Sequence, residues 1–176
     1  RELDSSEYAV YEPKAGEYYD ETAFEQFDSV NPELARPVPV VFGILKNFLL
    51  APEGNRIILI LTARNQIVEQ SVRDFLRLEF EKEDDEQRKQ ILLKSISDIH
   101  FRGVGDSNPS KKVEVIKEYI NMLEKDYNIE EVSFFDDSEK NVIAVRDHLN
   151  AIGIKHDIAK PESKPEGGTY MPRYRE

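Results

Sequence analysis

Apolar residues form two kinds of pattern, which take turns along the chain. In one, apolar residues follow each other in a continuous run, and in the other they recur every three or four residues, as on one face of a helix. The continuous runs predict strands, and the first of them is typical of a strand buried on both faces of a parallel sheet. They lie at 57–61, 99–104, 132–135 and 154–158. The stretches with helical spacing predict amphipathic helices between the strands. They lie at 38–50, 66–78, 112–125 and 140–151.

Turn-forming and capping residues agree with these boundaries. Pro37 and Pro39 stand at the start of the first helix, and Gly153 follows the last one. Residues 106–110 offer capping side chains for the helix at 112–125. The highly charged stretch 79–94 predicts a solvated helical extension or an insertion.

Alternation of strand and helix indicates the fold class. We predict an α/β fold, a three-layer sandwich with a mainly parallel, Rossmann-like sheet and right-handed crossovers. Residues 1–36 are acidic, rich in Tyr and interrupted by Pro and Gly, which predicts a small, irregular, cap-like segment. Residues 37–159 would form the α/β core, and residues 160–176 a polar tail. A length of 176 residues fits one domain with a real core.

Composition excludes several functional classes. The formal net charge is -11 and the pI is near 4.9, which disfavours strong non-specific binding to nucleic acid because such binding needs a basic face. No apolar run approaches the roughly 20 residues of a membrane span. The absence of cysteine excludes disulfides, thiolate nucleophiles and cysteine-type zinc sites, and it fits a reducing compartment such as the cytoplasm.

Polar residues suited to phosphate chemistry come near the ends of three predicted strands. They are Thr62, Ala63 and Arg64 after the first strand, Lys112 near the second, and Asp136 and Asp137 after the third. Ligands bind outside the carboxyl ends of strands in an open α/β sheet. Adjacent carboxylates repel each other, so the acid pair predicts half of a divalent-cation site. The Thr62 hydroxyl, with backbone N–H groups entering the next helix, would form an anion-binding corner.

Each of these positions also has a purely structural interpretation. Thr62 would simply cap a helix, and Lys112 would be a solvated surface lysine. Asp136 and Asp137 would cap the helix at 140–151. Their order at successive strand ends favours the functional interpretation, since a hydroxyl, an ammonium and a carboxylate pair can hold a phosphoryl group and its metal.

The same residues resemble the motifs of the haloacid dehalogenase-type (HAD) phosphohydrolases. The second HAD motif, a hydrophobic strand followed by Thr or Ser, resembles residues 57–64. The third motif, a Lys near a helix start, resembles residues 108–113, and the fourth, an acidic pair after a strand, resembles residues 134–142. The resemblance covers residues 37–159. As a whole, the chain is similar to small HAD-like proteins encoded by bacteriophages.

This resemblance implies a mechanism and a cofactor. A nucleophilic Asp would form an aspartyl-phosphate, and a second Asp two residues later would act as general acid and then base. Mg²⁺ would be held by the nucleophile and by Asp137, with Asp136 in support. Thr62 and Lys112 would hold the phosphoryl oxygens, and Lys112 would also restrain the nucleophile. Arg64 would contact the phosphate or base of a small phosphorylated substrate, a nucleotide or a nucleic-acid end.

The sequence departs from the family at the first HAD motif. That motif, Asp-x-Asp-x-Thr after an apolar strand, is absent from the 176 residues. In the family it lies on the central strand before the cap segment, so we expect it upstream of Arg1, on a stretch of about 20 to 30 residues. Without that strand, those at 57–61 and 132–135 would have no neighbour between them. Pairing of these two strands with each other would contradict this expectation.

Two other functions stay open from the sequence. In the first, the chain is a catalytically inactive HAD-like binding or virion-associated structural protein, with residues 160–176 packed on a partner or a second copy. A phage-encoded protein would act in the host cytoplasm or in the virion. The second is a receiver-type phosphoacceptor domain, which also combines an acidic pair, a Thr and a Lys. Its acidic pair comes first in the chain, whereas here the order is Thr62, Lys112, Asp136.

Overall fold

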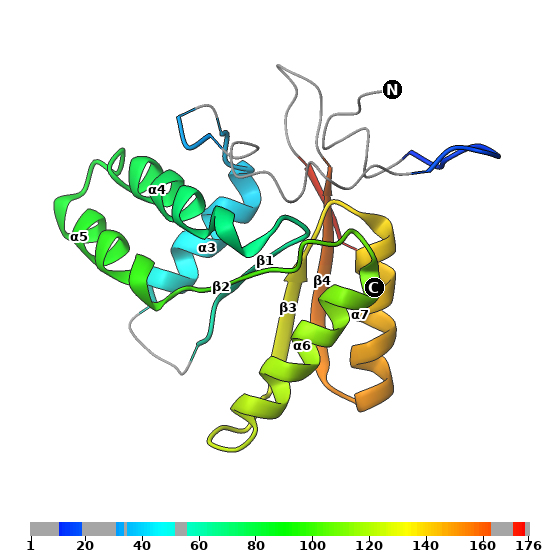
Figure 1. Cartoon of the computed structure of the whole chain (residues 1–176). Coiled ribbons are helices and arrows are strands. Elements are labelled where there is room, and N and C mark those ends of the chain that lie inside the picture. The colour runs from blue at the N-terminus through cyan, green and yellow to red at the C-terminus, as the bar shows by residue number, and fades with distance from the viewer. Residues whose placement is uncertain (1–10, 19–30, 34, 52–55, 163–170, 175–176) are drawn as a thin grey trace. The chain divides into compact units, whose positions relative to one another are not determined.

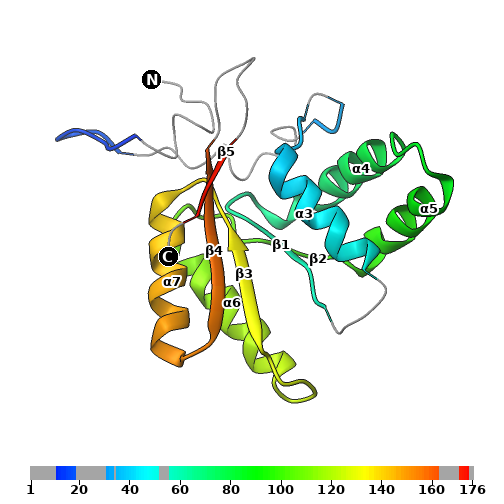
Figure 2. The same cartoon turned by 180° about the vertical axis from the view of Figure 1, so that it is seen from behind.

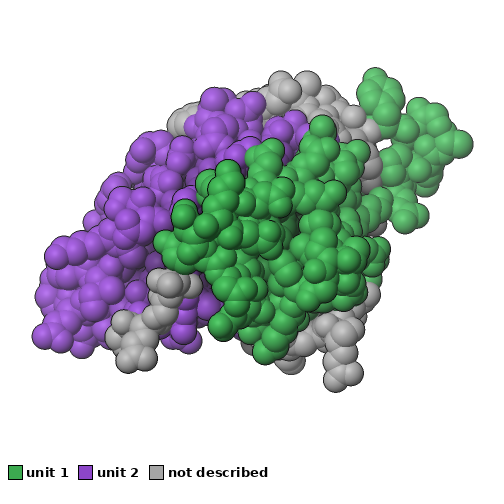
Figure 3. Space-filling view, turned by 90° about the horizontal axis from the view of Figure 1, so that it is seen from below, with its two compact units in different colours: residues 1–20, 108–176 green, residues 21–107 purple. Residues whose placement is uncertain are grey.

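The protein has an α/β fold in which short strands form two small sheets (Figures 1 and 2). The computed structural model describes residues 11–18, 31–33, 35–51, 56–162 and 171–174. The chain divides into two compact units, coloured separately in Figure 3. Unit 1 comprises residues 1–20 and 108–176, and unit 2 comprises residues 21–107.

Unit 2 combines three helices with a pair of parallel strands. Its elements are α3 (Pro39–Leu50), β1 (Leu59–Thr62), the 3-10 turn η2 (Gln66–Val68), α4 (Glu69–Phe80), α5 (Glu86–Ser95), the 3-10 turn η3 (Ile96–Asp98) and β2 (His100–Gly103). Leu59 lies opposite His100, and Thr62 lies opposite Gly103. The helix predicted at 38–50, the helix predicted at 66–78 and the strand predicted at 99–104 are therefore confirmed, with shifted ends.

Apolar side chains from the three helices form the core of unit 2. Phe80 and Leu92 are completely buried, and the rings of Phe42 and Phe80 stack with their centroids 5.6 Å apart. In the charged stretch 79–94, helix α4 is not extended: it ends at Phe80, and a separate helix is inserted after it. A new helix, α5, starts after Asp85, whose side chain accepts a hydrogen bond from the Arg88 N–H at 2.8 Å. Burial of Leu92 is what fixes this helix to the core.

Strand β1 differs from its prediction in position and in burial. It begins at Leu59 rather than at residue 57, and Thr62 is its last residue rather than the first residue after it. All four residues are only partly buried, although the apolar run predicted a strand covered on both faces. β1 pairs with β2 and with no other strand in the described part of the chain, which explains the incomplete burial.

Arg73 joins α4 to the turn that leads into β2. Its guanidinium donates hydrogen bonds to the carbonyl oxygens of Ile96 at 2.6 Å and Ile99 at 2.9 Å, and it forms an ion pair with Glu69 at 2.8 Å. The Ile96 carbonyl oxygen also accepts the Ile99 N–H that closes the η3 turn, at 3.3 Å. A single partly buried side chain thus adds a charged donor to two backbone carbonyl groups at this turn.

We expect replacement of Arg73 by methionine to lower the free energy of unfolding by about 2 to 3 kcal/mol, because two carbonyl groups lose a charged donor. Arg77→Met is the matched control, one turn further along α4. Arg77 pairs with Asp74 at 2.9 Å, but its side chain is 50% exposed, so its loss should change stability by less than about 1 kcal/mol. Urea unfolding followed by circular dichroism measures both. Equal effects of the two substitutions would contradict the role given to Arg73.

Unit 1 places two helices against a three-stranded sheet. Its elements are α6 (Pro109–Leu123), β3 (Glu131–Phe135), α7 (Glu139–Ile152), β4 (Lys155–Glu162) and β5 (Met171–Tyr174). β3 and β4 are parallel, and β5 is antiparallel to β4. Figures 1 and 2 show α6 and α7 side by side over the same face of β3 and β4. Val142, Val145 and Leu149 of α7 supply the buried side of this packing.

The helix ends in unit 1 follow the predicted caps. Asn108 caps α6 by accepting a hydrogen bond from the Ser110 N–H at 3.0 Å, and Pro109 is the first helical residue. Gly153 ends α7 with a positive φ of 71°, a conformation that suits glycine because it has no Cβ. The caps predicted from 106–110 and from Gly153 are confirmed.

The structure describes only parts of the two ends of the chain, residues 1–36 and 160–176. Within the polar tail predicted from residue 160, β4 continues to Glu162 and residues 171–174 form β5. Residues 171–174 form a strand because they pair with β4, and the composition of the tail alone does not predict this pairing. In the segment 1–36, the structure describes a turn at Lys14–Glu17, closed by a hydrogen bond from the Glu17 N–H to the Lys14 oxygen at 2.9 Å. Most of the predicted cap-like segment lies outside the described residues.

The strands do not form the single sheet that we predicted. β1 and β2 make one sheet, and β3, β4 and β5 make another. Among the described residues, β1 and β3 each have one edge that pairs with no strand, and they do not pair with each other. This agrees with the expectation that the strands at 57–61 and 132–135 are not neighbours.

Candidate functional site

Asp136 is the centre of a buried polar cluster in unit 1. It follows the last residue of β3, and its carboxylate accepts a hydrogen bond from the Ser138 N–H at 2.8 Å on Oδ1. Oδ2 accepts from Lys112 Nζ at 2.6 Å and from Asn141 Nδ2 at 3.0 Å. The side chains of Lys112 and Asp136 are only 10% and 7% exposed. A carboxylate and an ammonium removed from water to this extent require each other.

Local structure positions each member of this cluster. The cap at Asn108 sets the start of α6, so that Lys112 lies in its first turns and faces inward beside Val115 and Ile116. Asn141 lies in the first turn of α7 on the same buried side as Val142. The lysine is therefore not the solvated surface residue of the structural interpretation.

Asp137 differs from its neighbour because it remains exposed at the surface. The pKa of its carboxyl is raised above the usual value, first because nearby protein atoms remove water and second because of repulsion by Asp136. Lys112 opposes this rise in pKa without cancelling it. No ion pair joins Asp137 to a lysine or arginine in the described residues. An acid in this position favours a bound cation.

A metal ion such as Mg²⁺ typically binds one or two carboxylates while it keeps several waters. Of the acid pair, Asp137 is the residue that has no ion pair with a lysine or arginine in the described part of the chain. Both oxygens of Asp136 already accept hydrogen bonds, so Asp136 acts mainly through Lys112 and Asn141. Within the described ranges, no group of three or more His, Asp or Glu side chains is placed to hold a metal ion.

The loop after β1, in unit 2, is tied down by hydrogen bonds. Thr62 Oγ1 accepts from the Arg64 N–H at 3.2 Å, and Asn65 Oδ1 accepts from the Ile67 N–H at 3.1 Å. Two of the backbone donors expected in an anion-binding corner are thus already used. The Thr62 hydroxyl keeps its own proton as a donor. The Arg64 side chain is partly buried, and this burial lowers its pKa.

Gly103 of β2 allows this loop to lie close to the strand. A Cβ at this position would lie 2.5 Å from the Asn65 carbonyl carbon and 2.6 Å from Arg64 O and Gln66 N. These are backbone atoms, which cannot rotate away. The Gln66 side chain completes the contact, because its Oε1 accepts from the Gly103 N–H at 2.7 Å.

Gly103→Ala is therefore expected to displace the 62–66 loop and to lower the free energy of unfolding by about 1 to 3 kcal/mol. Gly43→Ala in α3 is the control, since nothing lies within 4 Å of a Cβ there. It should instead raise stability by about 0.5 to 1 kcal/mol through helix propensity. Chemical denaturation gives the stabilities, and amide chemical shifts report the loop. An unchanged loop in Gly103→Ala would contradict the close approach.

The structure groups the predicted site residues in two sets. Lys112, Asp136 and Asp137 lie together in unit 1, whereas Thr62, Ala63 and Arg64 lie in the β1 loop of unit 2. Asn141 was not among the predicted residues, although it belongs to the buried cluster. Its signal in the sequence is a polar residue on the apolar face of a predicted helix, next to Val142.

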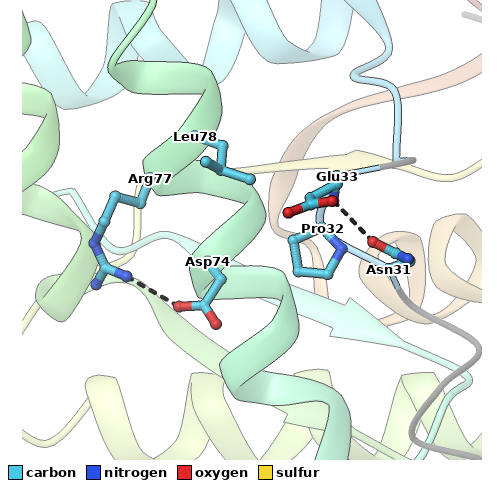
Figure 4. A pocket seen from close by; sticks show the side chains of 6 residues that line it. All are labelled: Asn31, Pro32, Glu33, Asp74, Arg77 and Leu78. Carbon is cyan, nitrogen blue, oxygen red and sulfur yellow. Dashed lines mark hydrogen bonds and ion pairs between the residues drawn. The ribbon is translucent and has the colours of Figure 1, made fainter.

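A hollow in unit 2 does not compete with these residues as a site. Figure 4 shows Asp74 and Arg77 pointing toward each other at its side, joined by their ion pair at 2.9 Å. Asn31 Oδ1 accepts a hydrogen bond from the Glu33 N–H at 3.0 Å. Pro32 and Leu78 complete the lining. The side chains of Asp74 and Arg77 and the side-chain oxygen of Asn31 thus have partners within the protein.

The chain matches no model of a known protein family, no curated protein and no solved structure. No helix in the part of the chain that the structure describes is both long enough and apolar enough to cross a membrane.

Proposed function

We propose that the intact protein is a Mg²⁺-dependent phosphatase of the HAD type that hydrolyses phosphomonoesters. The observation that carries this proposal is the buried cluster of Lys112, Asp136 and Asn141, next to an exposed Asp137 with a raised pKa. A merely structural acid pair would have both carboxylates solvated or both paired. Here one carboxylate is fixed by an internal cation, and the other is left with an unfavourable charge that a divalent cation would offset.

The residues of the chain would share the work as follows. Asp136 and Asn141 hold Lys112, so that the ammonium keeps a fixed position from which it can contact a phosphoryl oxygen. By the resemblance to the HAD family, the Thr62 hydroxyl would donate to a phosphoryl oxygen, and Ala63 and Arg64 would line the substrate side. When bound to Asp137, Mg²⁺ supplies positive charge that stabilises the transferring phosphoryl group. In this proposal the nucleophilic Asp, and the acid–base Asp two residues after it, would lie outside the 176 residues.

This proposal includes the finer fold, a three-layer HAD-like sandwich completed by the strand that carries these two residues. The edges of β1 and β3 that pair with no strand among the described residues support it, because a strand inside a sheet has hydrogen-bond partners on both edges. Small phosphorylated molecules or nucleotides in the cytoplasm are the substrates we infer, and they suit an acidic protein in which cations are placed only locally.

The test uses the intact protein with a generic phosphomonoester and with nucleoside monophosphates. We expect release of phosphate that requires Mg²⁺ and stops on addition of EDTA. The 176-residue chain alone should be inactive while still folded by circular dichroism. Folded intact protein that releases no phosphate with any of these substrates would refute the proposal and favour the binding or virion-associated alternative.

A further inference from the structure

Arg64 stands apart from the other cations of unit 2. Its side chain is partly buried, yet it forms no ion pair with a carboxylate in the described residues. Lys46, Arg73 and Arg77 of the same unit each pair with an acidic side chain. The chain carries 35 acidic residues against 24 lysines and arginines, so acidic partners are abundant.

A guanidinium that is partly removed from water without an anion is unfavourable, and burial lowers the pKa of Arg64 for this reason. An anionic ligand would restore the lost solvation. The planar fork of arginine binds phosphate through two parallel hydrogen bonds, which favours phosphate over a lone halide or hydroxide.

The backbone that carries Arg64 is fixed before any ligand arrives. Its N–H donates to Thr62 Oγ1 at 3.2 Å, and its carbonyl oxygen accepts from the Gly105 N–H at 3.1 Å. The preceding residue, Ala63, accepts from the Asp106 N–H at 3.0 Å. A fixed backbone lowers the entropy that is lost when the side chain binds an anion.

We propose that Arg64 binds a second phosphate group of the substrate, one that is not hydrolysed. The preferred substrates are then phosphomonoesters that carry another phosphate nearby, either small bisphosphorylated molecules or the phosphorylated end of a nucleic acid. Arg64 follows Thr62 by two residues, at most about 7 Å further along the chain. Its guanidinium can thus reach the part of the ligand beyond the group that the Thr62 hydroxyl contacts. This assignment of the second group rests on the proposed phosphatase function.

Binding to the 176-residue chain tests the inference without turnover. Isothermal titration calorimetry would compare inorganic phosphate, pyrophosphate and a phosphate-terminated dinucleotide. We expect Arg64→Gln to weaken pyrophosphate binding by about 10- to 100-fold and to weaken the binding of inorganic phosphate by less. Arg64→Lys, which keeps the charge but loses the fork, should fall between. Arg56→Gln, at an exposed arginine over the Phe48 ring, is the control and should bind as the unmodified chain does.

Three results would overturn the inference: no measurable pyrophosphate binding, no effect of Arg64→Gln, or equal losses for phosphate and pyrophosphate in a folded variant. Tighter binding of either the dinucleotide or pyrophosphate that depends on Arg64 supports it and identifies the source of the second phosphate. The intact protein separates this inference from the proposed function. Hydrolysis by Arg64→Gln at the unmodified rate on both monophosphate and bisphosphate substrates refutes the inference alone. Arg64-dependent pyrophosphate binding in an intact protein without hydrolysis refutes the phosphatase proposal alone.

Discussion

Asp136→Asn should lower the free energy of unfolding by about 3 to 5 kcal/mol, because it leaves the Lys112 ammonium buried without a counter-charge. Asp137→Asn, one residue away, should have the opposite sign and raise stability slightly. That substitution removes a carboxylate whose pKa is raised by loss of water and by repulsion from Asp136. Urea denaturation at neutral pH measures both variants under identical conditions.

The pH dependence of stability, compared between Asp137→Asn and the unmodified chain, checks the sign of the effect predicted for Asp137. The folded state raises the pKa of Asp137 above its usual 3.8, so the folded chain binds this proton more readily than the unfolded chain. The penalty from the ionised carboxylate is full above the raised pKa and disappears as the pH falls toward the usual value. The stability difference between Asp137→Asn and the unmodified chain should therefore shrink on acidification. A destabilised Asp137→Asn variant at neutral pH would contradict the assignment.

Asp137→Asn should also reduce Mg²⁺-dependent phosphate release by the intact protein by about 100- to 1000-fold, as expected when stabilisation of the transferring charge is lost. Asp147→Asn provides the control, since it neutralises an exposed acid on α7, outside the Asp136 cluster. On the proposed function Mg²⁺ would bind the ionised carboxylate of Asp137, so the apparent affinity for Mg²⁺ should fall on acidification as this carboxylate takes up its proton. A folded Asp137→Asn variant with normal turnover would remove Asp137 from the metal site.

Together these predictions describe an adjacent acid pair with divided roles. Asp136 is expected to contribute to stability, whereas Asp137 is expected to reduce stability and, on the proposed function, to supply a charge that binds the metal. A loss of stability in Asp136→Asn and a loss of activity in Asp137→Asn would separate the two roles. Substitutions at Asn141 should resemble those at Asp136 in sign and be smaller, because a neutral donor is lost rather than a charge.

Periodicity and capping residues were sufficient to predict most elements of the fold. Helices α3, α6 and α7 lie where apolar residues recur at helical spacing, and Asn108 and Gly153 mark their ends. Strand β5 could not be predicted in this way, since residues 171–174 lack an apolar run and owe their conformation to pairing with β4. The composition of a short segment does not predict which distant strand it pairs with.

The separation into two sheets was likewise beyond the reach of strand prediction, because apolar runs identify strands but not their neighbours. For the site, the sequence identified the acid pair and Lys112 from their places near strand ends. It did not distinguish Asp136 from Asp137, since the difference arises from what each carboxylate meets after folding. It also missed Asn141, whose amide becomes relevant only once α6 and β3 bring Lys112 and Asp136 together.

In the described part of the chain, one edge of β1 pairs with no strand, and this has a practical consequence for anyone who prepares the chain in isolation. Leu59, Ile60 and Leu61 present backbone donors and acceptors beside partly exposed apolar side chains. Such an edge acts as a template for strands from other molecules, so concentrated samples should tend to self-associate. A short synthetic peptide with strong strand propensity, added in excess, could occupy that edge and keep the preparation monodisperse.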